Sequence, residues 1–213
     1  SAFTYYCGFK VNSGEYKLMG LAPYGSPLYV QKIKDYLIDI KDDGTFKLDI
    51  SYFQYHRGFR MTSRKFHKLF GSPPRGRESE LTQFHMDLAA SIQLVTEEIV
   101  LKLAKTLKIE TGLNNICLAG GVALNCVANG KLIKEKIFDN IWIQPASGDA
   151  GSAIGAALIG WYENLNRKRE IDPYDSMKGT YLGPNFSNED IICYLKKINA
   201  PFEVLQDDDL FEK

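Results

Sequence analysis

The sequence lacks an apolar run long enough to cross a membrane. Its longest nearly uncharged stretch of small and apolar residues, Ala150 to Tyr162, is shorter than the ~20 residues that a transmembrane helix requires. The first residues, SAFTYYCGFKV, also lack the charged leader of a signal peptide. We therefore expect no membrane partner.

An excess of either charge is also lacking, because 26 Lys and Arg residues balance 26 Asp and Glu residues. No overall field draws the chain toward nucleic acid. Seven Lys or Arg residues and no acid lie between Arg57 and Arg77. Such a run can follow a phosphate backbone, but it is more often a solvated insertion, so we do not expect nucleic acid as a partner.

Paired cysteines are missing too. Cys7, Cys117, Cys126 and Cys193 form no C-x-x-C motif and no cysteine/histidine group with zinc spacing. This pattern is typical of buried free thiols in a reducing compartment, which indicates a cytoplasmic protein. The histidines form no H-x-x-x-H or H-E-x-x-H pair, and we expect His67 and His85 to be structural or surface residues on helices.

What the sequence does contain is an alternation of short strands and helices, which is typical of an α/β fold with mostly parallel pairing. The first half predicts a strand at 3–11, a shaped loop at 14–27, a helix at 26–40, a strand at 45–50, a short helix capped by Thr62 or Ser63 and ending at Gly71, and a long helix at 79–110. The second half predicts strands at 116–119 and 141–144, helices at 122–136 and 149–165, a polar linker, a helix capped at Ser187, and finally a strand and the start of a helix.

Two strand-turn-helix units carry glycines at the turn: CLAGGVALNCVANG, residues 117–130, and IQPASGDAGSAIGAA, residues 143–157. Parallel strands would bring both turns to one edge of the sheet, where helix N-termini attract anions. Gly120 and Gly121 in the first turn, and Gly148 and Gly151 in the second, would let a ligand approach the backbone. Neither turn is a P-loop or a G-x-G-x-x-G fingerprint, so a packing role and a phosphate-binding role both remain open.

Polar residues beside these turns also allow two interpretations. Asp149 is either a helix N-cap or a carboxylate directed at a cation that bridges phosphate oxygens. Asn125 and Asn129 lie four residues apart on a predicted helix, so they share a face that is either solvated or lines the cleft. The small residues of the following helix require something to pack very close to it.

Four segments in order, GEYKLMGLAPYG, LAGGVALNCVANGKL, PASGDAGSAIGAAL and YLGPNFSNEDI, resemble the ATP-dependent O-carbamoyltransferases of the nodulation and antibiotic-tailoring type. The resemblance implies an actin-like ATPase (ribonuclease H-like) lobe with a mixed sheet, a helical insertion at about 26–78 and a short C-terminal segment. It implies the second lobe of the carbamoyl-transfer domain at 1–174 and, at 175–213, a linker and the start of the domain that forms carbamoyl-adenylate.

The same resemblance implies the ligands. Members use ATP and carbamoyl phosphate, form carbamoyl-adenylate, and pass the carbamoyl group to the hydroxyl of a sugar or natural product. By position, Gly120, Gly121, Val122, Asn125 and Gly148 correspond to nucleotide-binding segments, Lys17 to a cleft-facing motif, and Asp149 to a ligand of a divalent metal, iron or magnesium-like. The other ligands, a histidine pair, would lie in an N-terminal lobe of the same polypeptide. Transfer to tRNA, or a non-catalytic nucleotide-binding module, is the alternative.

Overall fold

The computed structural model describes residues 1–170, 174, 177–181 and 183–212. They form two compact units, Ser1–Asn166 and Arg167–Lys213. The predicted boundary near 174–179 lies partly outside the described residues, and the units divide at residue 166. Within the described part of the chain, no helix combines the length and apolarity needed to span a bilayer.

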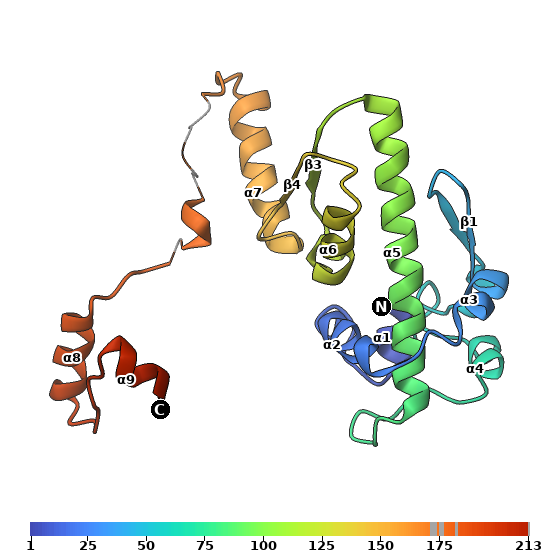
Figure 1. The fold of residues 1–213 in the computed structure, drawn as a ribbon, viewed down its shortest axis with the longest axis horizontal. Coiled ribbons are helices and arrows are strands. Elements are labelled where there is room, and N and C mark those ends of the chain that lie inside the picture. Colours follow the sequence, from blue (N-terminus) through green and yellow to red (C-terminus); the bar gives the residue numbers. More distant parts are fainter. Residues whose placement is uncertain (171–173, 175–176, 182, 213) are drawn as a thin grey trace. The chain divides into compact units, whose positions relative to one another are not determined.

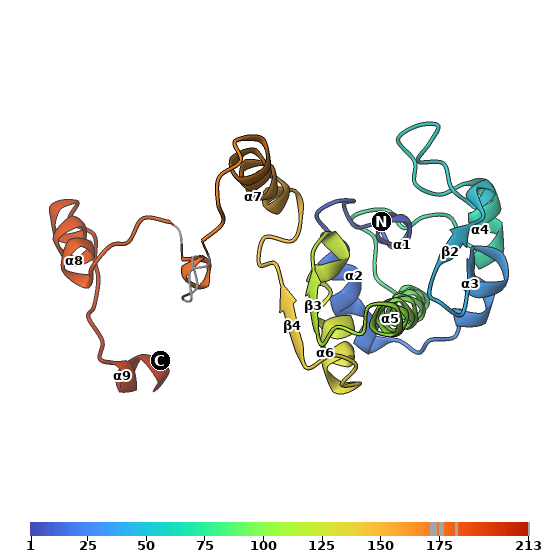
Figure 2. The ribbon, with the colours of Figure 1, turned by 90° about the horizontal axis from the view of Figure 1, so that it is seen from above.

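Helix α5, Gln83–Thr111, runs through the first unit. Thr82 and His85 form a capping box at its start, and Gly112 ends it at a φ of 66°. Figures 1 and 2 both show α6 and the β3–β4 pair on one side of α5, and α3, α4 and the β1–β2 pair on the other. The predicted long helix is therefore confirmed, and it is the common support for both halves of this unit.

The elements before α5 share one aromatic core with it. They are α1 Ala2–Tyr6, α2 Glu15–Leu21, η1 Ala22–Tyr24, α3 Val30–Tyr36, β1 Ile38–Ile40, β2 Phe46–Leu48, η2 Ile50–Tyr52 and α4 Arg64–Phe70. Phe3 and Tyr6 of α1 pack edge-on against Phe66 of α4, and Leu88 of α5 is fully buried in the same cluster. The segment 26–78 thus contributes to the main core and has no separate core of its own.

Two predictions for the N-terminal segment are wrong. The expected strand at 3–11 begins as helix α1, because a helix places Phe3 and Tyr6 on one face toward α4. The expected loop at 14–27 contains α2 and η1, whose Leu18, Leu21 and Ala22 pack near Ala89 of α5. Tertiary packing outweighs β-propensity in the first case and glycine content in the second.

The second half follows the predicted alternation. Its elements are β3 Asn115–Leu118, η3 Gly121–Leu124, α6 Cys126–Lys134, β4 Asn140–Ile143, α7 Asp149–Ile159 and a π-helical turn at Gly160–Asn164. Strands β3 and β4 are parallel, with Cys117 opposite Trp142. Ala104 of α5 joins Ile116, Leu132 and Phe138 in the core beneath them. The parallel pairing is as predicted.

The second unit contains η5 Lys178–Thr180, α8 Asn188–Lys197 and α9 Asp207–Glu212 among its described residues. Ser187 caps α8 by accepting from the Asp190 amide, as predicted. The strand expected after α8 is wrong, since the described residues 201–206 adopt no strand. The observed fold is α/β, with one antiparallel and one parallel two-stranded sheet in the described residues.

Candidate functional site

The two glycine turns meet at the carboxyl edge of the β3–β4 sheet. The Gly120 amide donates to the Ser147 carbonyl at 2.9 Å, which joins the turn after β3 to the turn after β4. Residues of both turns line one hollow of about 350 Å³, together with one face of α7. The structure thus brings together Gly120, Gly121, Gly148 and Asp149, as parallel pairing predicted.

The glycines in this hollow leave space that no neighbouring atom fills. Apart from its own and the adjacent residues, a Cβ at Gly120, Gly121 or Gly148 would have no heavy atom within 4 Å. Gly120 also has a φ of 97° and a ψ of 164°, a region that only glycine adopts readily. Gly151 differs, because its Cβ would overlap the Ala146 carbonyl, so that glycine serves packing. Open space beside a glycine backbone is suited to a phosphate-bearing ligand.

Asp149 is the first residue of α7, and Gly148 is the N-cap, so the first of the two alternatives for Asp149, a helix N-cap, is wrong. The carboxylate lies in the first turn, where the α7 dipole favours negative charge. Asp149 is exposed. In the described part of the chain, no three His, Cys, Asp or Glu side chains are grouped to hold a metal ion. Asp149 can therefore supply one oxygen ligand, and a complete metal site needs others.

Three predicted site residues lie outside this hollow. Val122, in η3, is 61% exposed but does not line the cavity. Lys17 is exposed on α2, with its Nζ 6.0 Å from the Tyr16 ring centre. Asn125 was expected within a helix, but it is the N-cap of α6, because η3 and α6 are separate elements. It therefore does not share a helix face with Asn129.

Several residues of the hollow were missed by sequence reasoning. Trp142 of β4 lines it, and so do Gln144, directly after β4, and Ser152 of α7. Alternation along a strand places Trp142 and Gln144 on the same face, so the period of two could have identified them. Ser147 is buried and its hydroxyl donates to the Gln144 carbonyl, which stabilises the turn. The hollow thus has a polar edge and an apolar wall that includes half-exposed Trp142.

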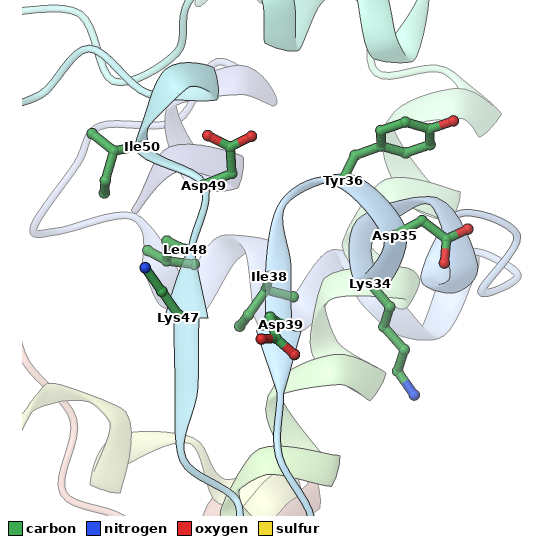
Figure 3. Close-up of a pocket in the computed structure, with 9 residues that line it drawn as sticks. All are labelled: Lys34, Asp35, Tyr36, Ile38, Asp39, Lys47, Leu48, Asp49 and Ile50. Atoms are coloured by element: carbon green, nitrogen blue, oxygen red, sulfur yellow. The ribbon is translucent and has the colours of Figure 1, made fainter.

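A larger depression of about 490 Å³ lies between the end of α3 and the β1–β2 hairpin. Figure 3 shows its side chains pointing in different directions from α3, β1, β2 and the start of η2. Lys34 is paired with Glu98 at 2.5 Å, and Asp49 with Lys65 at 3.4 Å. Lys34 and Asp49 are thus paired with neighbouring side chains, and no predicted site residue lines this depression. We therefore take the smaller hollow as the candidate site.

The cysteines differ from the expectation of four buried thiols. Only Cys7 is buried, and Cys117, Cys126 and Cys193 are exposed. Burial raises the pKa of the Cys7 thiol to about 12, so this sulfur remains protonated at neutral pH. Cys117 points outward by strand alternation, and Cys126 lies at the exposed first position of α6.

His67 and His85 have structural roles on helix α4 and at the start of α5, within the predicted alternatives. His67 of α4 shares a 2.9 Å hydrogen bond with Thr62, and His85 Nδ1 accepts from the Thr82 amide at 3.1 Å. Burial, and secondarily a nearby arginine charge, lowers the pKa of both imidazoles.

Comparison with known proteins identifies relatives across most of the chain. The family described as Carbamoyltransferase N-terminus matches residues 1–158. An uncharacterized protein of Synechocystis sp. is 60% identical over 100% of this chain and 35% of its own length. Nodulation protein NolO of Bradyrhizobium diazoefficiens is 36% identical over 82% of this chain and 29% of its own length. The chain spans about a third of these relatives.

Proposed function

This chain belongs to the carbamoyltransferase family, and we propose that it forms the nucleotide-binding part of an O-carbamoyltransferase. In this proposal the complete protein uses ATP and carbamoyl phosphate to form carbamoyl-adenylate. It then transfers the carbamoyl group to the hydroxyl of a sugar or another small molecule. The observation that carries the proposal is the meeting of two glycine turns at one hollow, joined by the Gly120–Ser147 hydrogen bond.

The backbone around the hollow suits the nucleotide. Gly120, Gly121 and Gly148 leave space beside their backbone, so phosphate oxygens can approach the turns. The Gly120 amide already donates to the Ser147 carbonyl, so the proposed phosphate contacts fall to the amides of Gly121 and Gly148. No side chain caps the N-terminus of α7, and the α7 dipole adds positive potential there. These groups would orient the phosphates and stabilise charge that develops during transfer, without an ionisable nucleophile.

A divalent metal fits the same edge only in part. Asp149 offers a carboxylate of the type that such ions prefer, and we propose it as one ligand. The remaining ligands would come from an N-terminal lobe of the same polypeptide, in an actin-like arrangement of two lobes. A bound metal would act as a Lewis acid on phosphate or carbamoyl oxygens.

The decisive experiment measures AMP release by the full-length protein supplied with ATP, Mg²⁺, carbamoyl phosphate and a panel of hydroxyl acceptors. We expect AMP formation that requires carbamoyl phosphate and is lost in Asp149→Asn. A matched control is Asp35→Asn, since Asp35 is an exposed carboxylate on α3, away from the glycine turns. ATP binding without AMP formation under any condition would instead support a non-catalytic nucleotide-binding module.

Transfer to tRNA is the weaker alternative, because its support is confined to the basic segment 57–77. Two of that segment's cations have partners within the fold. Lys65 lies 3.9 Å from the Tyr52 ring centre, and Arg75 Nε donates to the Cys7 carbonyl at 2.7 Å. We therefore retain a small-molecule hydroxyl as the proposed acceptor.

A further inference from the structure

A polar network joins the middle of α5 to the start of α6, directly behind the glycine turn. Asn125 Nδ2 donates to Gln93 Oε1 at 2.9 Å, and Gln93 Nε2 approaches Asn125 Oδ1 at 3.2 Å. Gln93 Nε2 also donates to Glu97 Oε1 at 2.8 Å. Lys131 of α6 completes the network by donating to Glu97 Oε2 at 3.1 Å. The paired amides therefore connect a helix cap to a buried carboxylate.

The groups at the two ends of the network determine how the side-chain amides of Gln93 and Asn125 are oriented. Glu97 is only 8% exposed, and its ionised carboxylate accepts hydrogen bonds only, so Gln93 must turn its nitrogen toward it. At the other end, Asn125 Oδ1 accepts from the Ala128 amide at 3.0 Å, which directs the Asn125 nitrogen toward Gln93. The orientation of the pair follows from fixed donors and acceptors at both ends.

The network is tied to the turn that lines the hollow. The backbone N–H of Asn125 donates to the Val122 carbonyl at 2.9 Å, and Asn129 Nδ2 donates to the Ala123 carbonyl at 2.7 Å. Both carbonyls belong to η3, which begins at Gly121. A displacement of Asn125 would therefore displace η3, while the Asn125 side chain itself does not line the hollow.

We propose that Asn125 is a positioning residue held by Gln93 and Glu97, and that it fixes the Gly120–Gly121 turn from behind without contacting the nucleotide. This inference rests on the proposed binding of ATP at that turn. An N-cap needs only the oxygen of Asn125. The side-chain nitrogen of Asn125 is not needed for capping. Its hydrogen bond to Gln93 connects the end of η3 to α5.

The test is a double-mutant cycle on ATP affinity in the full-length protein, with Asn125→Ser and Gln93→Met. Serine keeps the N-cap oxygen and adds no charge, but it removes the donor to Gln93. We expect each single variant to bind ATP with Mg²⁺ up to about tenfold more weakly, as for loss of one partly buried hydrogen bond. The double variant should bind ATP no more weakly than Gln93→Met, because Gln93→Met alone already removes the hydrogen bond between residues 93 and 125.

A second cycle replaces Gln93→Met by Glu97→Gln, in case the first variant does not fold. The side-chain amide that Glu97→Gln introduces can donate as well as accept, so Gln93 is no longer forced into one orientation. We expect Glu97→Gln alone to bind ATP more weakly than the unmodified protein. Adding Asn125→Ser to Glu97→Gln should weaken ATP binding little further. Gln31→Met is the matched control, because Gln31 bonds Asp35 on the surface of α3.

Calorimetric titration with ATP, below the unfolding temperature of every variant, separates the outcomes. If Asn125→Ser weakens binding by the same factor in all backgrounds, Asn125 contacts the nucleotide directly and the inference is wrong, although the proposed function stands. Unchanged affinity in every variant also overturns the inference alone. If the unmodified protein binds no ATP, the proposed function fails first and the inference fails with it.

Discussion

Gly120 and Gly121 are neighbours with different backbone requirements. Gly120 has a φ of 97°, and Gly121 has no positive φ. Apart from adjacent residues, a Cβ on either glycine would meet no atom within 4 Å. We expect Gly120→Ala to lower the free energy of unfolding by about 1–3 kcal/mol, from backbone strain alone. Gly121→Ala should change it by less than about 0.5 kcal/mol. Chemical denaturation of both variants checks this, and equal losses would contradict the strain argument.

The same pair separates stability from ligand binding. If phosphate oxygens approach the backbone at this turn, the added methyl group of Gly121→Ala occupies their space. We expect weaker ATP binding by Gly121→Ala in the full-length protein, although its stability is nearly unchanged. Affinity equal to that of the unmodified protein would place the nucleotide elsewhere.

Asp149 is also expected to affect activity much more than stability. Its carboxylate is exposed in the first turn of α7, and the favourable interaction with the helix dipole is worth about 0.3–1 kcal/mol. Asp149→Asn should therefore cost less than about 1 kcal/mol in unfolding free energy, while it abolishes AMP formation. Thermal denaturation and the AMP assay on the same preparation test both parts. A large loss of stability would indicate a structural role.

The N-terminal cap of α5 makes stability depend on pH. His85 Nδ1 accepts from the Thr82 amide, so the neutral imidazole forms the cap. Burial, then the charge of Arg75, lowers the pKa of His85 in the folded state. The unfolded chain thus binds more protons in the acid range, and stability contributed by this group falls as pH drops below about 6.5.

The variant His85→Gln tests this dependence. Gln is the usual partner at this position of a capping box and does not titrate in this range. We expect the decline in unfolding free energy between pH 7 and pH 5 to be shallower in His85→Gln. His67 also has a lowered pKa and remains in the variant, so part of the decline persists. An unchanged slope would exclude His85 as a contributor.

The first unit leaves helix α7 uncovered. None of its residues is buried, and Leu158 and Ile159 are 49% and 53% exposed. Apolar helices in folded proteins are normally covered, and the relatives are about three times as long as this chain. We expect the rest of the full-length polypeptide to pack on α7.

Hydrogen exchange of the 213-residue chain and the full-length protein checks this. The α7 amides should exchange about tenfold more slowly in the full-length protein. Amides around Leu88 in α5 provide the internal control, since Leu88 is fully buried in the 213-residue chain. Equal exchange of α7 in the two proteins would contradict the expected covering.

Local signals in the sequence determined several elements in both halves of the chain. These signals each act within a few residues. They are the helix N-caps Ser63 and Ser187, the glycines Gly71 and Gly112 that end α4 and α5, and the strand alternation around Ile116. Such signals do not depend on distant contacts, so the elements and the meeting of the two glycine turns could be predicted. The resemblance to carbamoyltransferases likewise rested on motifs in order along the chain, and the family is confirmed.

Tertiary structure decided the rest. Phe3 and Tyr6 became helical because α4 and α5 supply the surface that a helix face can bury, and no local pattern contains that surface. The side-chain nitrogen of Asn125 donates to Gln93, thirty-two residues earlier, and no local pattern indicates that partner. A side chain's local propensity can be read from the sequence, but its partners are set by elements that meet only in the folded chain.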